Sequence, residues 1–135
     1  MSSTSVTIYP EGGLGNGTLT YGTIVSGFQP KTVASKELDA ALTELIADIE
    51  QTNPDLRLSN SRQAFTLGSV QARRLDWMGK SVIQEKGEPL PERVRLIAFP
   101  GKSGVVLYTI FVAPDPDFNV LWPVYERMLN SLRVR

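Results

Sequence analysis

The sequence predicts an α+β domain in which an antiparallel sheet is flanked by helices. The first observation is an apolar run over residues 105–113 that does not alternate with polar residues, so a strand there must be covered on both faces. The second is apolar spacing of helical type over residues 38–49 and 118–132. The third is that short turns join several strand-like segments, which favours antiparallel neighbours.

Strand-like segments follow one another along the chain at 5–9, 18–28, 63–67, 70–78, 93–99 and 105–113. Gly68-Ser69 is typical of a hairpin turn, and residues 100–104 form a second turn of this kind. The predicted order is two strands, a helix, a meander of strands and a closing helix. We expect five or more strands in one sheet, with both helices packed on it.

The two helices differ in how clearly the sequence delimits them. Ser35 is a good N-cap for the first, and Asn53-Pro54 ends it. The second contains Pro123, which would cost about 3 kcal/mol inside a helix. We therefore expect a short turn over 117–121 and a helix that begins at Pro123 and ends near Ser131.

Composition limits the function classes. At 135 residues the chain, 1–135, is expected to form a single domain. Lys plus Arg and Asp plus Glu number 14 each, so no overall charge favours nucleic acid, and no apolar run approaches the ~20 residues that membrane insertion needs. The chain has no His and no Cys, which removes the preferred zinc ligands, the usual general base and the thiol nucleophile. We predict a non-enzymatic chain without cofactor, and composition leaves its localisation open.

Three local patterns invite a functional interpretation and are better explained structurally. The glycine-rich stretch 12–17 precedes a strand, whereas a phosphate-binding loop precedes a helix. An acidic register resembling a calcium loop has Val120 where a glycine is required, so we interpret it as a helix cap. The pair Glu85 and Glu88 lies in a predicted loop, where water would solvate both carboxylates, so it is a poor candidate for acid–base chemistry. The acidic register consists of Asp115, Asp117, Asn119 and Glu126.

The arginines and aromatic residues form looser sets. In strands, Arg93 and Arg95 would share a face, which we interpret as a solvated sheet face or edge protection, with a basic patch for an acidic partner as the alternative. The aromatic residues lie on apolar stripes and are expected in the core and its rim. The arginine set is Arg57, Arg62, Arg73, Arg74, Arg93, Arg95, Arg133 and Arg135, and the aromatic set is Trp77, Tyr108, Trp122 and Tyr125.

Two irregular segments are the predicted interaction loops, because binding residues concentrate on loops once sheet faces serve the core. They are the glycine-rich turn 11–17 and the charged loop 80–92. The alternative is that both are solvated connectors. The candidate interaction residues are Glu11, Asn16, Lys80, Glu85, Lys86 and Glu88.

Three stretches of the sequence carry a family resemblance. The ending LYTIFVAPDPDFNVLWPVYERMLNSLRVR resembles the end of domains with the PsbP-like α/β/α sandwich fold. Together with VTIYPEGGLGNGTLTYGTIVSGFQP and LDAALTELIADIEQTNPDLRL, it resembles the C-terminal region of secreted bacterial zinc metallopeptidases of the HtpX-like class. In those proteins an HExxH catalytic domain precedes a domain of this kind. Because this chain has no His, no catalytic residue or metal ligand can be carried over.

The resemblance implies a C-terminal fragment of a longer, extracytoplasmic protein. Its expected role is that of a non-catalytic accessory domain, which positions protein substrate or packs on the peptidase domain. The alternative is a free-standing PsbP-like module that docks on a protein complex through its sheet edge or its loops.

Overall fold

The computed structural model describes residues 6–8, 14–15, 18–30, 38–85, 87–101 and 105–131. Two helices and eight strands lie in these ranges, and a two-stranded ladder of β2 with β3 stands apart from the main sheet. The strands are β1 (Val6–Ile8), β2 (Leu14–Gly15), β3 (Thr18–Leu19), β4 (Gly22–Phe28), β5 (Arg57–Leu67), β6 (Val70–Glu85), β7 (Glu88–Pro100) and β8 (Val106–Pro114), and the helices are α1 (Leu38–Thr52) and α2 (Asp115–Ser131).

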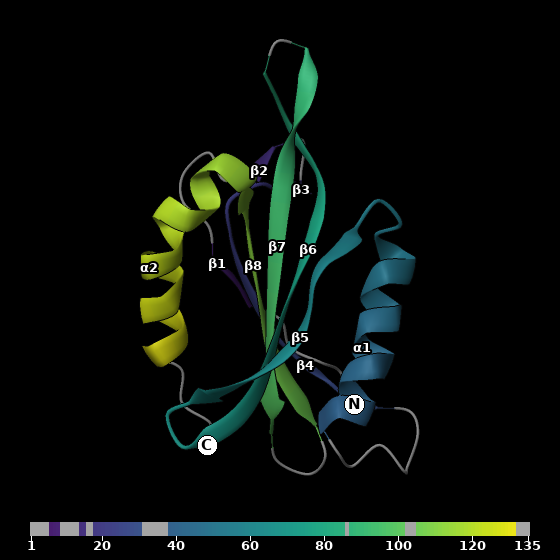
Figure 1. Cartoon of the computed structure of the whole chain (residues 1–135), viewed down its shortest axis with the longest axis vertical. Coiled ribbons are helices and arrows are strands. Elements are labelled where there is room, and N and C mark those ends of the chain that lie inside the picture. Colours follow the sequence, from purple (N-terminus) through teal and green to yellow (C-terminus); the bar gives the residue numbers. More distant parts are fainter. Residues whose placement is uncertain are drawn as a thin grey trace.

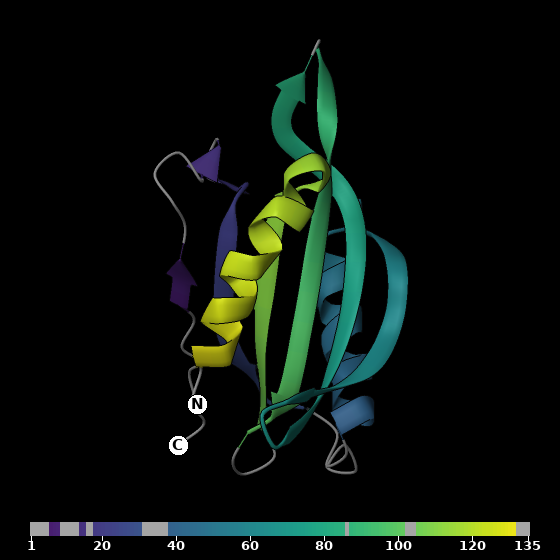
Figure 2. The same ribbon diagram turned by 60° about the vertical axis from the view of Figure 1, so that its left-hand side comes forward.

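The main sheet has six strands in the order β1-β4-β8-β7-β6-β5, and every neighbouring pair is antiparallel. α1 and α2 lie on opposite faces of this sheet (Figures 1 and 2). β8 lies between β4 and β7 and is covered on both faces, as its unbroken apolar sequence predicts. The predicted fold class, an antiparallel sheet flanked by helices, is therefore confirmed.

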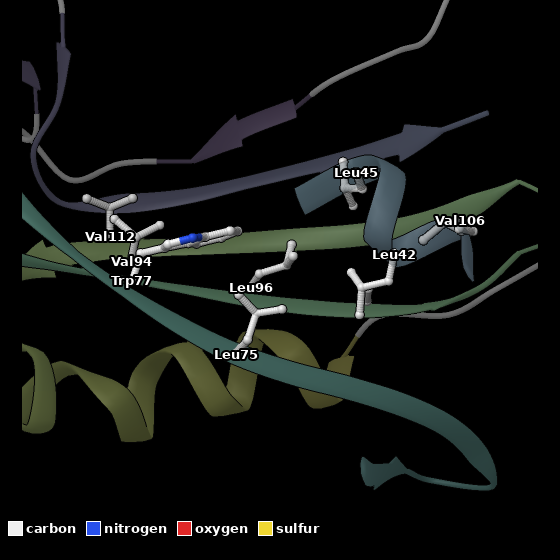
Figure 3. Close-up of a cluster of buried hydrophobic side chains, with 10 residues drawn as sticks. Leu42, Leu45, Leu75, Trp77, Val94, Leu96, Val106 and Val112 are labelled. Atoms are coloured by element: carbon white, nitrogen blue, oxygen red, sulfur yellow. The ribbon is translucent and has the colours of Figure 1, made fainter. Parts of the chain in front are cut away.

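The core beneath α1 is aliphatic around one large aromatic residue (Figure 3). Leu42 and Leu45 of the helix and Leu75 and Leu96 of the sheet are all buried there. Trp77 is fully buried, and its indole Nε1 donates a hydrogen bond to Glu50 Oε2 of α1 at 2.9 Å. The apolar residues that predicted this helix from their spacing are therefore the residues of α1 that pack on the sheet.

The core beneath α2 is aromatic. Phe118 and Tyr125 of the helix are buried against Phe111 of β8, and the ring centroids of Phe111 and Tyr125 lie 5.0 Å apart. Trp122 meets Phe111 edge-on at a centroid distance of 5.5 Å. These contacts fix the helix on this face along its middle turns.

The predicted loop 80–92 is wrong. β6 continues to Glu85 and β7 begins at Glu88, so the two strands form an arm that extends beyond the rest of the sheet (Figures 1 and 2). Pro89 and Pro91 suggested a loop, but the pairing of β7 with β8 ends at Glu92, so β7 has no second neighbour there. A proline is tolerated in a strand that has a free edge.

The predicted break at Pro123 is also wrong, because α2 is one helix through Ser131. Pro123 is exposed, so water can serve the Asn119 carbonyl that loses its helical partner. The buried side chains of Phe118 and Tyr125 hold the helix on the sheet on both sides of the proline. Tertiary packing here outweighs the local cost.

Other boundaries differ by less. β5 begins at Arg57 rather than at the predicted residue 63. Its first residues are exposed and do not alternate between apolar and polar, so the sequence pattern did not identify them as a strand. The predicted strand 18–28 is divided into β3 and β4 by a bend at residues 20–21. The hairpin turn at Gly68-Ser69 is confirmed, with Gly68 at φ +61°. The expected N-cap Ser35 lies outside the described residues.

Candidate functional site

The predicted interaction residues that the structure describes lie on strands rather than in a loop. Lys80 and Glu85 lie on β6 and Glu88 on β7, where Glu85 and Glu88 are paired across the arm. Gly87 turns the chain between them at φ +81°, a conformation that favours glycine. Three further candidates, Glu11, Asn16 and Lys86, lie outside the described residues.

A hollow in the described surface lies elsewhere, between β1 and the C-terminal half of α2. Two adjoining cavities of about 340 Å³ and about 120 Å³ share Ile8 and Met128 in their linings. We call them together the β1–α2 groove. The larger is lined by Ile8, Tyr21, Gly22, Leu121, Val124, Tyr125 and Met128, and the smaller by Ile8, Thr23, Val25, Thr109, Phe111, Met128, Leu129 and Ser131.

The pairing register explains why the edge of this groove is apolar. Val6 pairs with Val25 and Ile8 with Thr23, which places both β1 side chains on the α2 face of the sheet. α2 does not reach far enough to cover them, so they remain about half exposed. Val124 of α2 is exposed across the groove from Ile8. Contiguous exposed apolar residues of this kind are typical of interaction sites.

The polar groups in the smaller cavity are hydrogen-bonded within the protein. Thr23 Oγ1 and Thr109 Oγ1 are buried and lie 2.9 Å apart, with either hydroxyl able to donate. Ser131 Oγ donates to the carbonyl oxygen of Met128 at 2.6 Å. These bonds leave alkyl groups to line the cavity.

The two tyrosines of the larger cavity are also engaged. The Tyr125 hydroxyl donates to the Val112 carbonyl at 2.8 Å and accepts from the Gly22 amide at 3.0 Å. The Tyr21 hydroxyl donates to Asp117 Oδ2 at 2.6 Å, a bond that raises the pKa of Tyr21 to about 12. Burial raises the pKa of Tyr125 as well. Both phenols therefore stay neutral at physiological pH, and the groove offers apolar surface without a free charge on its lining residues.

A buried ion network lies on the same face of the sheet, beneath the beginning of α2. Arg95 Nε and Nη2 donate to the two oxygens of Asp76 at 2.8 and 3.0 Å. Arg93 Nη1 donates to Asp76 at 3.2 Å, and its Nε donates to Asp115 of α2 at 2.9 Å. Asn60 completes the set with a bond of 3.1 Å to Asp76. The network thus connects β5, β6 and β7 with the helix.

The network corrects the interpretation of Arg95 as part of a solvated face. This residue is only 9% exposed, and its guanidinium lies 4.3 Å from the ring centroid of Trp122 and 4.9 Å from that of Phe118. Burial alone would raise the pKa of Asp76, but hydrogen bonds and charge from the arginines outweigh it and lower that pKa. Two arginines balance two aspartates, so we assign the network to anchoring α2.

The acidic positions considered for calcium serve the same helix. Asp115 binds Arg93, and Asp117 accepts from Tyr21, both in the first turn of α2. Among the described residues no group of three or more His, Cys, Asp or Glu is arranged to hold a metal ion. Neither helix in these ranges is long and apolar enough to cross a membrane.

Comparison with known proteins gives a fold without a function. No protein-family model and no curated protein matches the chain. The crystal structure of PA94 from Pseudomonas aeruginosa, a protein of unknown function, is similar at a TM-score of 0.66 and 16% sequence identity. The match covers 99% of this chain and 83% of PA94. At this identity the similarity establishes the shared fold alone.

Proposed function

We propose that this chain is a non-catalytic binding domain that takes up an apolar segment of a protein partner in the β1–α2 groove. The observation that carries the proposal concerns the lining of the groove. Ile8 and Val124 expose apolar surface there, whereas the polar groups that line it are already hydrogen-bonded within the protein. A site of this kind gains affinity by removing apolar surface from water. It offers little to a polar substrate, which would lose hydrogen bonds to water without replacement.

In its narrower form the proposal makes this chain the accessory domain of an HtpX-like zinc metallopeptidase. The sequence resemblance supports this form, and the groove would then hold substrate or the peptidase domain. The alternative is a free-standing PsbP-like module that binds a protein complex. Reading the gene upstream of Met1 distinguishes them, because the accessory form requires a preceding HExxH segment and the free-standing form requires none.

The groove itself is tested with an array of twelve-residue peptides, apolar and polar, and four single variants. Ile8→Ser and Val124→Ser remove apolar surface from the groove. Leu58→Ser is a matched control, because Leu58 is 52% exposed against 48% for Ile8 but lies on the opposite sheet edge. Val120→Ser is the helix control, since Val120 is exposed on α2 and lines neither cavity.

The expected result is selective binding of apolar peptides, weakened about tenfold by either groove variant, which corresponds to about 1.4 kcal/mol. Both controls are expected to bind as the unaltered chain does. Failure of every apolar peptide to bind, or equal loss in groove and control variants, would contradict the proposed function.

A further inference from the structure

The edges of the sheet are not equally protected against pairing with another strand. β5, at one edge, shows register shifts between Leu58 and Asn60 and between Asn60 and Gln63. Its Arg62 donates to the Asp39 carbonyl of α1 at 2.9 Å, which links this edge strand to the helix. Bulges, polar side chains and cover by a helix are the devices that discourage further strands.

The arm carries a different protection. Pro89 and Pro91 lie on the part of β7 that extends past the end of β8. They stand at alternate positions, so both missing N–H groups would point to the same side of the strand. An arm with prolines on its exposed strand is a poor template for an additional strand.

β1, at the other edge of the sheet, has none of these features over its described residues. It consists of Val6, Thr7 and Ile8, without proline, charge or a register shift against β4. Its shortness is its one restraint on pairing. Its two apolar side chains point to the α2 face, and that of Ile8 lines both cavities of the groove.

We propose that the outer edge of β1 pairs with an extended segment of a partner protein whose alternate side chains are apolar and enter the β1–α2 groove. This inference rests on the proposed function and names how the partner is held. Main-chain hydrogen bonds to β1 would supply affinity, and the cavities beneath α2 would select the side chains at every second position. In a strand these side chains share one face, about 7 Å apart, which suits two adjoining cavities.

The charge of the site selects an uncharged segment. Tyr21 and Tyr125 stay neutral, and Asp117, which accepts a hydrogen bond from the Tyr21 hydroxyl, lines neither cavity. A charged side chain entering the cavities would lose its water without meeting a counter-charge from their described lining residues. The complementary partner therefore carries uncharged aliphatic residues at the positions that face the cavities.

The test compares four eight-residue peptides with the same valine and threonine content by fluorescence anisotropy. The first alternates the two residues. The second and third have the same sequence with N-methyl groups on alternate backbone amides, one peptide in each phase, so that strand pairing is blocked while the side chains are kept. The fourth places the valines at helical spacing. The unmethylated alternating peptide is expected to bind at least tenfold more tightly than the peptide with helical spacing. It is also expected to bind at least tenfold more tightly than one of the two methylated peptides, because methylation in that phase removes two main-chain hydrogen bonds.

Each other outcome overturns the inference in a recognisable way. If both methylated peptides bind as tightly as the unmethylated one, or if the helical peptide binds most tightly, the groove fills without strand pairing. The proposed function would then stand. Dimerisation of the chain that Ile8→Lys abolishes would make a second copy the occupant. Tighter peptide binding after removal of residues 1–5 or 132–135 would make a terminal segment the occupant. Absence of binding by every peptide would remove the proposed function as well.

Discussion

Replacing Asp76 by asparagine tests whether the ion network beneath α2 anchors the fold. The side chain of Asp76 is 3% exposed and accepts hydrogen bonds from Arg95, Arg93 and Asn60. The substitution leaves buried Arg95 without its anion, and breaking a buried pair in this way costs about 3–5 kcal/mol. Asp39→Asn is the matched control, because Asp39 also binds two arginines but its side chain is 51% exposed.

Urea denaturation at pH 7 measures both variants. Asp39→Asn is expected to cost about 1 kcal/mol or less, as exposed ion pairs do, against the larger loss for Asp76→Asn. The arginines lower the folded-state pKa of Asp76, so its contribution to stability is present above the ordinary pKa and is lost as pH falls through the lowered one. The acid-induced loss should therefore be smaller in Asp76→Asn. Equal destabilisation by the two variants would refute the assignment of the network to anchoring.

Three further predictions concern the cores, one carboxyl group and metal binding. Leu45→Ala and Phe111→Ala, one in each core, are expected to lower the free energy of unfolding by about 2–5 kcal/mol each, and losses under about 1 kcal/mol in urea would show that the cores are misassigned. Burial raises the pKa of Glu92 from 4.5 to about 7, so the free energy of unfolding should fall as pH rises through that window. Glu92→Gln should remove this pH dependence and add roughly 1–3 kcal/mol of stability at pH 8. A pH profile of stability that is the same in the variant would contradict this prediction. Calorimetry with Zn²⁺ is expected to show no stoichiometric binding tighter than micromolar, because the chain has no imidazole or thiolate ligand, and such binding would overturn the non-metallic assignment.

The layers of the fold could be predicted because burial leaves a periodic record in the sequence. The unbroken run that became β8 indicated cover on both faces, and the stripe containing Leu42 and Leu45 indicated the packed face of α1. Gly68 marked a turn by its conformational freedom. These patterns reflect local structural preferences, and such preferences predict the structure correctly where the tertiary fold agrees with them.

The arm and the first turns of the closing helix could not be predicted, because proline has a cost that depends on its neighbours; the predicted end of that helix near Ser131 is confirmed. Pro89 and Pro91 are tolerated because β8 ends beside Glu92, a fact of sheet topology rather than of sequence. Pro123 is tolerated because it is exposed between two buried aromatic residues. From the local sequence alone, a loop or a helix break is expected at each of these prolines.

The candidate site was missed for a related reason. Ile8 and Met128 come from opposite ends of the chain and meet only through the pairing of β1 with β4 and the packing of α2. A single exposed apolar residue is ordinary, so neither position carried a signal by itself. Asp76 lies between Leu75 and Trp77, and Arg95 lies between Val94 and Leu96. A charge between two large apolar residues offered a detectable sign of the ion network, because buried charges need partners.

Methionine methyl NMR during titration with the alternating valine–threonine peptide tests directly whether the β1–α2 groove binds an apolar segment. Met128 lines both cavities of the groove, whereas Met78 lies on β6 and lines neither, so it is an internal reference. We predict a saturable shift of the Met128 methyl signal with Met78 unmoved, with the midpoint about tenfold higher in Ile8→Ser and unchanged in Leu58→Ser. Peptide binding that leaves Met128 unmoved, or shifts both methyl signals alike, would contradict a binding site between β1 and α2.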